Sequence, residues 1–185
     1  GLSSDQASSH IKGLHSRVAN ELVGNMSTDT RQNRFRNLLR QSFDLNKISR
    51  FVLGSYWRTA NAQQRENFKN VFENYLVRSY AGSFSSYGGN DFKITHVNVN
   101  PSNSTALVNT SVLVRKNGGG TAPANLVWRL KDYGGNMKII DVTVENVSMS
   151  ITKRNEFSSI LRSNGGQIDA LIQQLAQNNS GARRG

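Results

Sequence analysis

The residues best suited to chemistry in this 185-residue chain are three histidines and a pair of carboxylates. His10 and His15 are five residues apart on a predicted helix, so they point in different directions, and His96 lies on a distant predicted strand. None of the three has the i, i+4 spacing with which a helix presents two metal ligands. Asp141 and Glu145 share one face of a predicted strand at roughly 13 Å, too far to act on one bond, so we expect them to contact a partner or an arginine. We therefore predict that the chain is not an enzyme and that it uses neither a metal ion nor a cofactor.

Two other features have the composition of anion-binding sites. The glycine run 118–120 lacks the Lys-Ser/Thr pair and the following helix of a phosphate-binding loop, so it is interpreted as a hairpin tip. Four arginines between positions 31 and 40 lie opposite an apolar helix face, which is typical of a solvated surface. The aromatic residues Phe68, Phe72 and Tyr75 are expected on a buried stripe, where they cannot stack on bases. We predict no nucleic-acid partner.

The net charge of +11 results from 23 Lys and Arg against 12 Asp and Glu. The basic residues are about 12% of the chain, close to the basic half of the charged content of an average protein, so the surplus reflects scarce carboxylates. Asn and Ser, with 22 residues each, supply much of the remaining polar surface. This composition is typical of a basic globular protein rather than of a disordered polycation.

The length favours one domain, because a single unit usually has about 100 to 200 residues. We expect this domain to cover residues 1–180, with a short tail over 180–185. The absence of cysteine excludes disulfides, thiolate metal sites and a cysteine nucleophile. No apolar stretch approaches the ~20 residues that cross a bilayer as a helix.

Apolar residues at steps of three and four predict that residues 1–85 are mainly helical. The predicted helices cover 11–26, 31–41, 45–56 and a longer segment that Asn61 caps. Ser4 and Asp5 are the expected N-caps of the first helix, and Met26 is the last residue of its apolar stripe.

The pattern changes after the breaker Gly88-Gly89-Asn90, and residues 91–150 predict an antiparallel sheet. The predicted strands cover 92–100, 105–115, 124–131 and 137–149. Their short connections indicate an antiparallel meander, and helical signals over 151–178 close the chain.

The predicted strands carry apolar side chains on both faces. Val108 and Val112 point one way on the second strand, whereas Leu107 and Leu113 point the other way. An antiparallel sheet with one solvated face should alternate cleanly. Either helices cover both faces of the sheet, or the sheet curves around a cavity.

Several segments in order resemble the MlaC family of periplasmic phospholipid-binding proteins, also described as a toluene-tolerance or ABC-transporter auxiliary family. The motifs, spread over residues 30 to 165, read SRFVLGSYWR, LVWRLKD and MKIIDVTVENVSMSITKRNEF, together with the Q..F...F..YLVRSYA pattern of residues 64–81. The sequence departs from the family pattern in three places. Trp128 is found where Tyr is common, Asn146 where Gly is usual, and Thr152-Lys153 where Asn-Tyr is usual.

The resemblance implies an α+β domain in which helices pack on a curved four-stranded antiparallel sheet of the nuclear-transport-factor-like type, enclosing a hydrophobic cavity. The proposed lipid-binding residues are Val52, Tyr56, Phe68, Phe72, Tyr75, Leu76, Val108, Val112, Leu126, Trp128, Leu130, Val142 and Val144. The candidates for the mouth of the cavity, near the headgroup, are Arg58, Arg78 and Arg129.

The resemblance further implies a carrier with phospholipid as cargo, periplasmic after removal of a signal peptide. Such carriers serve an inner-membrane ABC lipid transporter and an outer-membrane lipoprotein-porin complex, and they maintain outer-membrane lipid asymmetry. Two alternatives remain open: a paralogue that binds a hopanoid- or sterol-type lipid, and a nuclear-transport-factor-like enzyme. The enzyme would need a polar pair in the cavity, for example Tyr56 or Tyr75 with Asp141.

Overall fold

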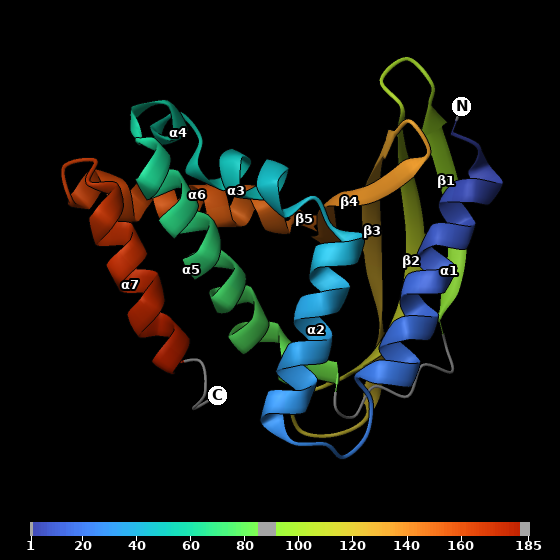
Figure 1. The fold of residues 1–185 in the computed structure, drawn as a ribbon. Helices are drawn as coiled ribbons and strands as arrows, with labels where there is room; N and C mark the ends of the chain where they lie inside the picture. The colour runs from blue at the N-terminus through green and yellow to red at the C-terminus, as the bar shows by residue number, and fades with distance from the viewer. Residues whose placement is uncertain (1, 85–91, 182–185) are drawn as a thin grey trace.

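A computed structural model describes residues 2–84 and 92–181, in which helices come first, a sheet second and helices last (Figure 1). The helices are α1 (Ser4–Glu21), α2 (Thr28–Ser42), α3 (Leu45–Leu53), α4 (Tyr56–Thr59), α5 (Ala62–Tyr80), the 3-10 helix η1 (Ala81–Phe84), α6 (Met149–Ser163) and α7 (Ile168–Gly181). The strands are β1 (Lys93–Asn100), β2 (Thr105–Arg115), β3 (Thr121–Tyr133), β4 (Asn136–Val144) and β5 (Val147–Ser148). This order confirms the predicted α+β class.

Two sequence-based predictions fall on the ends of the described segments. The breaker Gly88-Gly89-Asn90 lies outside the described residues. Helix α7 continues to Gly181, into the predicted tail, and residues 182–185 also lie outside the described part.

Helix α1 begins at Ser4, before the predicted range of 11–26, and its N-cap is Ser3 rather than the expected Ser4 or Asp5. The Ser3 hydroxyl accepts a hydrogen bond from the Gln6 backbone at 3.1 Å, and the Gln6 side chain accepts one from the Ser3 backbone at 2.9 Å. This capping box satisfies two donors that the first turn leaves free. The helix ends at Glu21, so Met26 lies beyond it and the predicted stripe was too long.

The predicted third helix is divided at Gly54, which has φ 57° and ψ −133°. Only glycine adopts such a backbone easily, so α3 ends at Leu53 and Tyr56 opens the separate turn α4. The guanidinium group of Arg154 on α6 fills the space where a side chain at this position would lie, with Nε 3.0 Å from an ideal Cβ. Arg154 also lies over the Phe51 ring, 5.0 Å from its centre.

The sheet is an antiparallel meander in the order β1-β2-β3-β4-β5, so it has five strands rather than the predicted four. The predicted last strand, 137–149, is interrupted by Glu145 and Asn146, which both have positive φ (47° and 67°). Two such residues make the tight turn that pairs β4 with the short β5. The last residue of β5, Ser148, is the N-cap of α6, which begins directly after the sheet.

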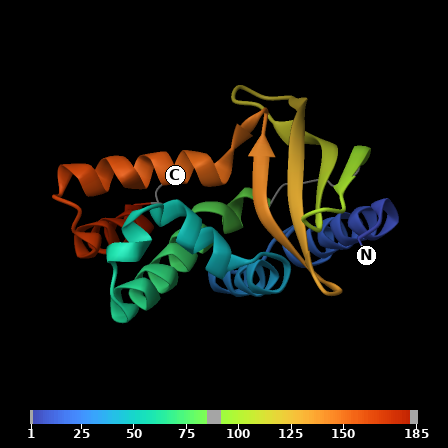
Figure 2. The same ribbon diagram turned by 90° about the horizontal axis from the view of Figure 1, so that it is seen from above.

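Helices α1 and α2 pack on one face of the sheet (Figure 2). This face carries Val108 of β2 opposite Trp128 of β3, which in turn lies opposite Val142 of β4. The other face carries Leu107 and Val127, which are half-buried and belong to neither core cluster described below.

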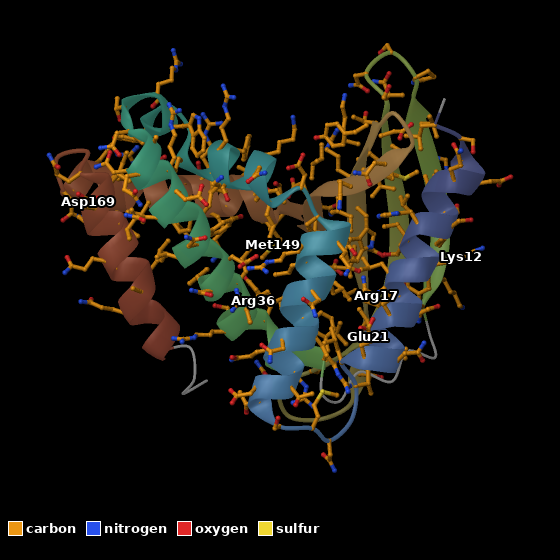
Figure 3. The ribbon with its side chains drawn as sticks, viewed as in Figure 1. Lys12, Arg17, Glu21, Arg36, Met149 and Asp169 are labelled. Carbon is orange, nitrogen blue, oxygen red and sulfur yellow. The ribbon has the colours of Figure 1, made fainter. Side chains whose placement is uncertain are left out.

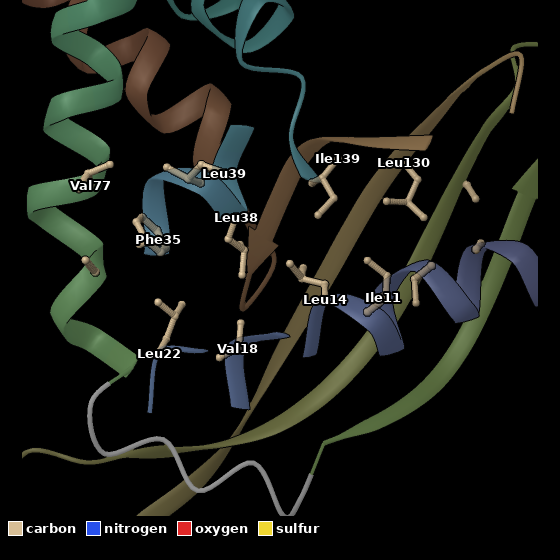
Figure 4. Close-up of a cluster of buried hydrophobic side chains, with 14 residues drawn as sticks. Ile11, Leu14, Val18, Leu22, Phe35, Leu38, Leu39, Val77, Leu130 and Ile139 are labelled. Carbon is tan, nitrogen blue, oxygen red and sulfur yellow. The ribbon is translucent and has the colours of Figure 1, made fainter. Parts of the chain in front are cut away.

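Most of the buried apolar side chains in the described residues belong to two clusters. The sheet cluster joins α1, α2 and the end of α5 to the sheet; its buried members include Leu14, Leu38, Val77, Leu130 and Ile139 (Figure 4). The helical cluster joins α3, α5, α6 and α7 through residues such as Val52, Phe68, Phe72, Phe157 and Leu171.

Ion pairs tie neighbouring helices together around these clusters. Arg36 of α2, which is labelled in Figure 3, and Arg40 of the same helix both bind the Glu73 carboxylate of α5, at 2.7 to 2.8 Å. The hydrogen bond from Arg40 holds the pKa of Glu73 below its ordinary value, and Arg36 acts in the same direction, against the effect of burial. Arg17 of α1 pairs with Glu21 at 2.7 Å and donates to Gln41 of α2 at 2.8 Å.

Candidate functional site

The two core clusters meet along a boundary that we call the seam. We define it by Phe43 and Leu76, which pack against both clusters, and by Tyr75 and Tyr80, which flank Leu76 on α5 and pack against the helical and the sheet cluster, respectively. All four side chains are half-buried, whereas the centres of both clusters are fully buried. Half-buried apolar side chains between two closed cores are the natural contact surface for an apolar ligand.

Most of the predicted helical wall residues lie in the helical cluster. Val52, Phe68 and Phe72 are at most 2% exposed. The rings of Phe68 and Phe72 stack at 5.6 Å, and Phe157 of α6 meets both edge-on at 6.0 and 5.8 Å. These three rings are an aromatic core contact of the kind that stabilises a fold.

The other predicted helical residues lie at the two ends of this cluster. Tyr56 is at the end far from the sheet, next to Gly166 in the connection between α6 and α7. Tyr75 and Leu76 are at the seam. The predicted helical wall is thus divided into a packed core, Tyr56 at its far end, and Tyr75 and Leu76 at the seam.

The predicted strand residues share one face of the sheet, as their cross-strand partners show. Val108, Trp128 and Val142 lie in one row, and Leu126 pairs with Val144 on the same face. Val108 and Leu130 are buried in the sheet cluster, and Trp128 and Val142 are half-buried against it. Val112 is buried as well, outside both clusters.

The indole of Trp128 is polar at one end and has a partner there. Its Nε1 donates to the Thr110 hydroxyl at 3.0 Å, and this hydroxyl donates to the Leu126 carbonyl at 2.8 Å. The chain of bonds fixes the ring on the sheet, so that its apolar part remains available for contact.

The structure does not bring the three candidate mouth arginines together. Arg58 is exposed on α4, near the start of α5, and Arg78 is half-buried near the end of α5. Helix α5, which separates these two arginines, has 19 residues and is about 28 Å long. Arg129 is exposed and alternates with Trp128 and Leu130, so it projects from the opposite face of the sheet.

A polar group of side chains lies at the seam between α5 and α6. The Lys153 ammonium donates to the Tyr75 hydroxyl at 2.9 Å and to a Glu156 carboxylate oxygen at 3.2 Å. Burial alone would lower the pKa of Lys153, but the hydrogen bond to Tyr75 and the neighbouring Tyr80 raise it above its ordinary value. Burial raises the pKa of Tyr80, so Tyr80 is neutral and Lys153 is charged at neutral pH.

Two cavities lie beside α2, α3 and α5. One, of about 430 Å³, is lined by Arg40, Phe43, Asp44, Leu45, Asn46, Glu73, Tyr133, Asn136 and Lys138. The other, of about 140 Å³, includes Phe72 among mostly polar residues. Since Phe72 is the one predicted wall residue that lines either of them, these two cavities are not the predicted apolar site.

The two carboxylates of the predicted last strand have structural partners. Asp141 accepts hydrogen bonds from the Ser148 hydroxyl and, at 3.1 Å, from the Ser150 backbone, so it supports the start of α6. Glu145 accepts a hydrogen bond from the Asn125 backbone at 2.5 Å. In the described residues, no three His, Asp or Glu side chains approach closely enough to hold a metal ion. Instead of the proposed pairing with Asp141, Tyr75 binds Lys153.

Sequence reasoning missed Phe157, Lys153 and Tyr80. Phe157 and Leu161 are four residues apart on a helix, and this spacing could have marked Phe157 as buried. The contact of Lys153 with Tyr75 spans 78 residues, and no local pattern indicates it.

Comparison with known proteins adds relatives to this geometry. A family model described as MlaC protein matches residues 13–177. Over 131 residues the chain is 28% identical to the intermembrane phospholipid transport system binding protein MlaC of Haemophilus influenzae, covering 70% of this chain and 59% of that protein. Over 130 residues it is 23% identical to the toluene tolerance protein ttg2D of Pseudomonas putida, covering 70% and 58%. The match thus spans just under three fifths of either relative.

A solved structure shares the fold over nearly the whole chain. It is the phospholipid-binding protein from Ralstonia solanacearum in complex with a phospholipid, with a TM-score of 0.75 at 18% identity, covering 98% of this chain and 99% of that one. Among the described residues, no helix combines the length and apolar character needed to cross a membrane.

Proposed function

Because this chain belongs to the MlaC family, we propose that it is a phospholipid carrier that holds its cargo along the seam. The carrier acts in the periplasm as the binding component of an ABC-type lipid transport system that maintains outer-membrane lipid asymmetry. Its partners are the inner-membrane transporter complex and an outer-membrane lipoprotein-porin complex. Residues 1–180 act as one lipid-binding domain.

The observation that carries this proposal is the family match, which extends over residues 13–177. The names of the two curated relatives refer to intermembrane phospholipid transport and toluene tolerance. The Ralstonia protein with the same fold was solved with a phospholipid bound. Each name describes a relative, and the common theme supports phospholipid as the cargo here.

The side chains proposed to contact the acyl chains are the half-buried apolar ones at or next to the seam. Leu76 projects from α5 between the two clusters, and Trp128 and Val142 lie on the helix-covered face of the sheet. An acyl chain at the seam is shielded by both cores without unfolding either of them. The fully buried Phe68 and Phe72 then support the wall from behind.

The free energy of such binding is dominated by the acyl chains. Each buried methylene contributes ~0.8 kcal/mol, so two chains of ~16 carbons have a gross transfer free energy above ~20 kcal/mol. A bilayer stabilises the same chains by a similar amount, so a carrier exchanges lipid by contact rather than by release into water. The net charge of +11 draws this carrier toward anionic lipid surfaces.

Native mass spectrometry of gently purified protein, followed by organic extraction, tests the proposal. We expect a bound mass of about the size of one diacyl phospholipid, recovered as phospholipid in the extract. Protein that takes up no lipid, even after incubation with phospholipid vesicles, would overturn it.

A matched pair of variants tests the place of binding. Val142→Asn puts an amide against the proposed acyl chain, which costs about 1–3 kcal/mol and weakens lipid retention at least fivefold. Val127→Asn makes the same change at a half-buried position on the opposite face, and we expect lipid retention as in the unmodified protein. Equal loss of lipid in both variants would contradict the seam as the binding site.

A further inference from the structure

The Lys153 ammonium is the basis of an inference that rests on the proposed function and refines it. We propose that Lys153 makes the seam select phospholipids whose headgroup carries a net negative charge over zwitterionic ones. The lysine side chain is only 13% exposed, yet it is held between the hydroxyl of Tyr75 and a carboxylate at the rim of the seam.

The position of the ammonium places it beside the proposed cargo. Tyr75 packs on the helical cluster, Tyr80 packs on the sheet cluster, and Leu76 between them contacts both. The Lys153 ammonium lies 5.1 Å from the centre of the Tyr75 ring. A lipid with its chains against Leu76 therefore has this charge at the polar edge of the seam.

The present partners of Lys153 leave room for an anion. An ammonium has three donors, and the hydrogen bonds to Tyr75 and Glu156 use two of them. Glu156 is 51% exposed and lies one helical turn away, so its side chain can rotate into water when another anion approaches. Tyr75 keeps the ammonium in place during the exchange.

A purely structural role explains this arrangement poorly. An i, i+3 ion pair with the exposed Glu156 contributes little to stability, and moving the Lys153 ammonium out of water has a cost. The raised pKa of Lys153 keeps the charge in spite of that burial. A residue that remains charged at an apolar boundary is suited to binding an oppositely charged group.

Selectivity follows from the whole headgroup rather than from the phosphate. Every diacyl phospholipid has a phosphodiester that can accept from Lys153. A zwitterionic headgroup also brings its own ammonium, which Lys153 repels, whereas phosphatidylglycerol brings none. We expect roughly tenfold enrichment of phosphatidylglycerol, which corresponds to about 1.4 kcal/mol.

The test is a competition between two lipids that differ only in headgroup. The full chain is incubated with vesicles of equimolar phosphatidylglycerol and phosphatidylethanolamine with the same acyl chains, separated, extracted, and analysed for both lipids. Lys153→Gln keeps a hydrogen-bond donor for Tyr75 without the charge, and we expect its extract to match the vesicles at unchanged total lipid. Lys153→Arg should retain the enrichment. Lys12→Gln, an exposed change on α1, should have no effect (Figure 3).

A second variant acts in the opposite direction. Glu156→Gln removes the competing carboxylate, so we expect stronger enrichment of phosphatidylglycerol, and this arm decides the question even where Lys153→Gln does not fold. The inference is overturned when lipid binds without enrichment, when Lys153→Gln keeps the enrichment, or when Glu156→Gln leaves or lowers it. Absence of all lipid from the unmodified protein would instead refute the proposed function.

Discussion

Gly54 offers a sharp test of how the helical part of the molecule is built. We expect Gly54→Ala to destabilise the protein, because the backbone at this position has φ 57° and ψ −133°. An alanine Cβ would also lie 3.0 Å from Nε of Arg154, closer than such atoms normally come. The Arg154 side chain is exposed and can shift aside from its contact with the Phe51 ring, so we expect the backbone to contribute most of the cost.

The magnitude follows from two opposing contributions. A side chain in this backbone region costs about 1–3 kcal/mol, and the contact with Arg154 adds to it. Replacing glycine also restricts the unfolded chain, which returns about 0.4–1 kcal/mol. The net loss is therefore about 2 kcal/mol, or about 4–8 °C in Tm for a chain of this length.

Thermal unfolding followed by circular dichroism measures this shift, with Gly13→Ala as the matched control. Gly13 is exposed inside α1, and a Cβ there meets no atom within 4 Å. The same substitution should therefore raise the free energy of unfolding by about 0.5–1 kcal/mol. The double variant Gly54→Ala with Arg154→Ala separates the backbone contribution from the contact with Arg154.

The result that refutes this reasoning is a Gly54→Ala protein as stable as the unmodified one, or more stable. A loss in the single variant that Arg154→Ala fully restores would show instead that the contact, not the backbone, forbids a side chain here.

Three further predictions concern charges and turns. Glu73→Gln should lower the free energy of unfolding by about 1–2 kcal/mol near neutral pH, because it weakens the hydrogen bond from Arg40. The folded pKa of Glu73 is depressed, so this stabilisation is present above the ordinary carboxyl pKa and is lost as the pH falls through the folded value. The Tm curves of the variant and the unmodified protein should therefore converge in acid, and a constant gap between them would contradict the prediction. Burial, with the 2.6 Å hydrogen bond to Asp44, raises the pKa of Tyr133 to about 12. The stabilisation is therefore complete below pH 10 and lost as the pH rises through 12. Ultraviolet titration of Tyr133→Phe should show one late-ionising phenol fewer than the unmodified protein, and an unchanged late phase would refute the assignment. Asn146→Gly should raise the free energy of unfolding by about 0.5–1 kcal/mol, because φ is 67° at this position, whereas Asn146→Ala should lower it. Urea titrations measure both changes, and a lower free energy of unfolding for the Gly variant would count against the turn geometry.

The sequence predicted the helices and the meander well where a strong period defines them, and less well at their ends. The inner stripe of α1 is buried at Ile11, Leu14 and Val18, as its spacing requires. The ends depend on single backbone conformations, such as that of Gly54, which periodicity does not contain. The turn at Glu145 escaped prediction because glutamate rarely adopts positive φ.

The candidate site was predictable in its residue types but not in its arrangement. Alternation placed Val108 and Val112 on one face of β2, and both are buried, whereas Leu107 and Leu113 on the other face are more exposed. Phe72 has the same apolar character and period as a wall residue, yet it lies in the packed helical cluster, and sequence does not distinguish the two roles. The pairing of Lys153 with Tyr75 is set by how α6 lies on α5, a tertiary relation between distant segments.

The outer strand β1 bears on how this protein behaves at high concentration. Within the described residues it is the outermost strand and pairs with β2 along one side only, and such edges invite pairing with another molecule. Its exposed residues include Lys93, His96 and Asn98, and the register shifts between Ile94 and His96. A charged, polar and irregular edge is a poor template for further strands, so we expect this edge to resist pairing between copies at high concentration.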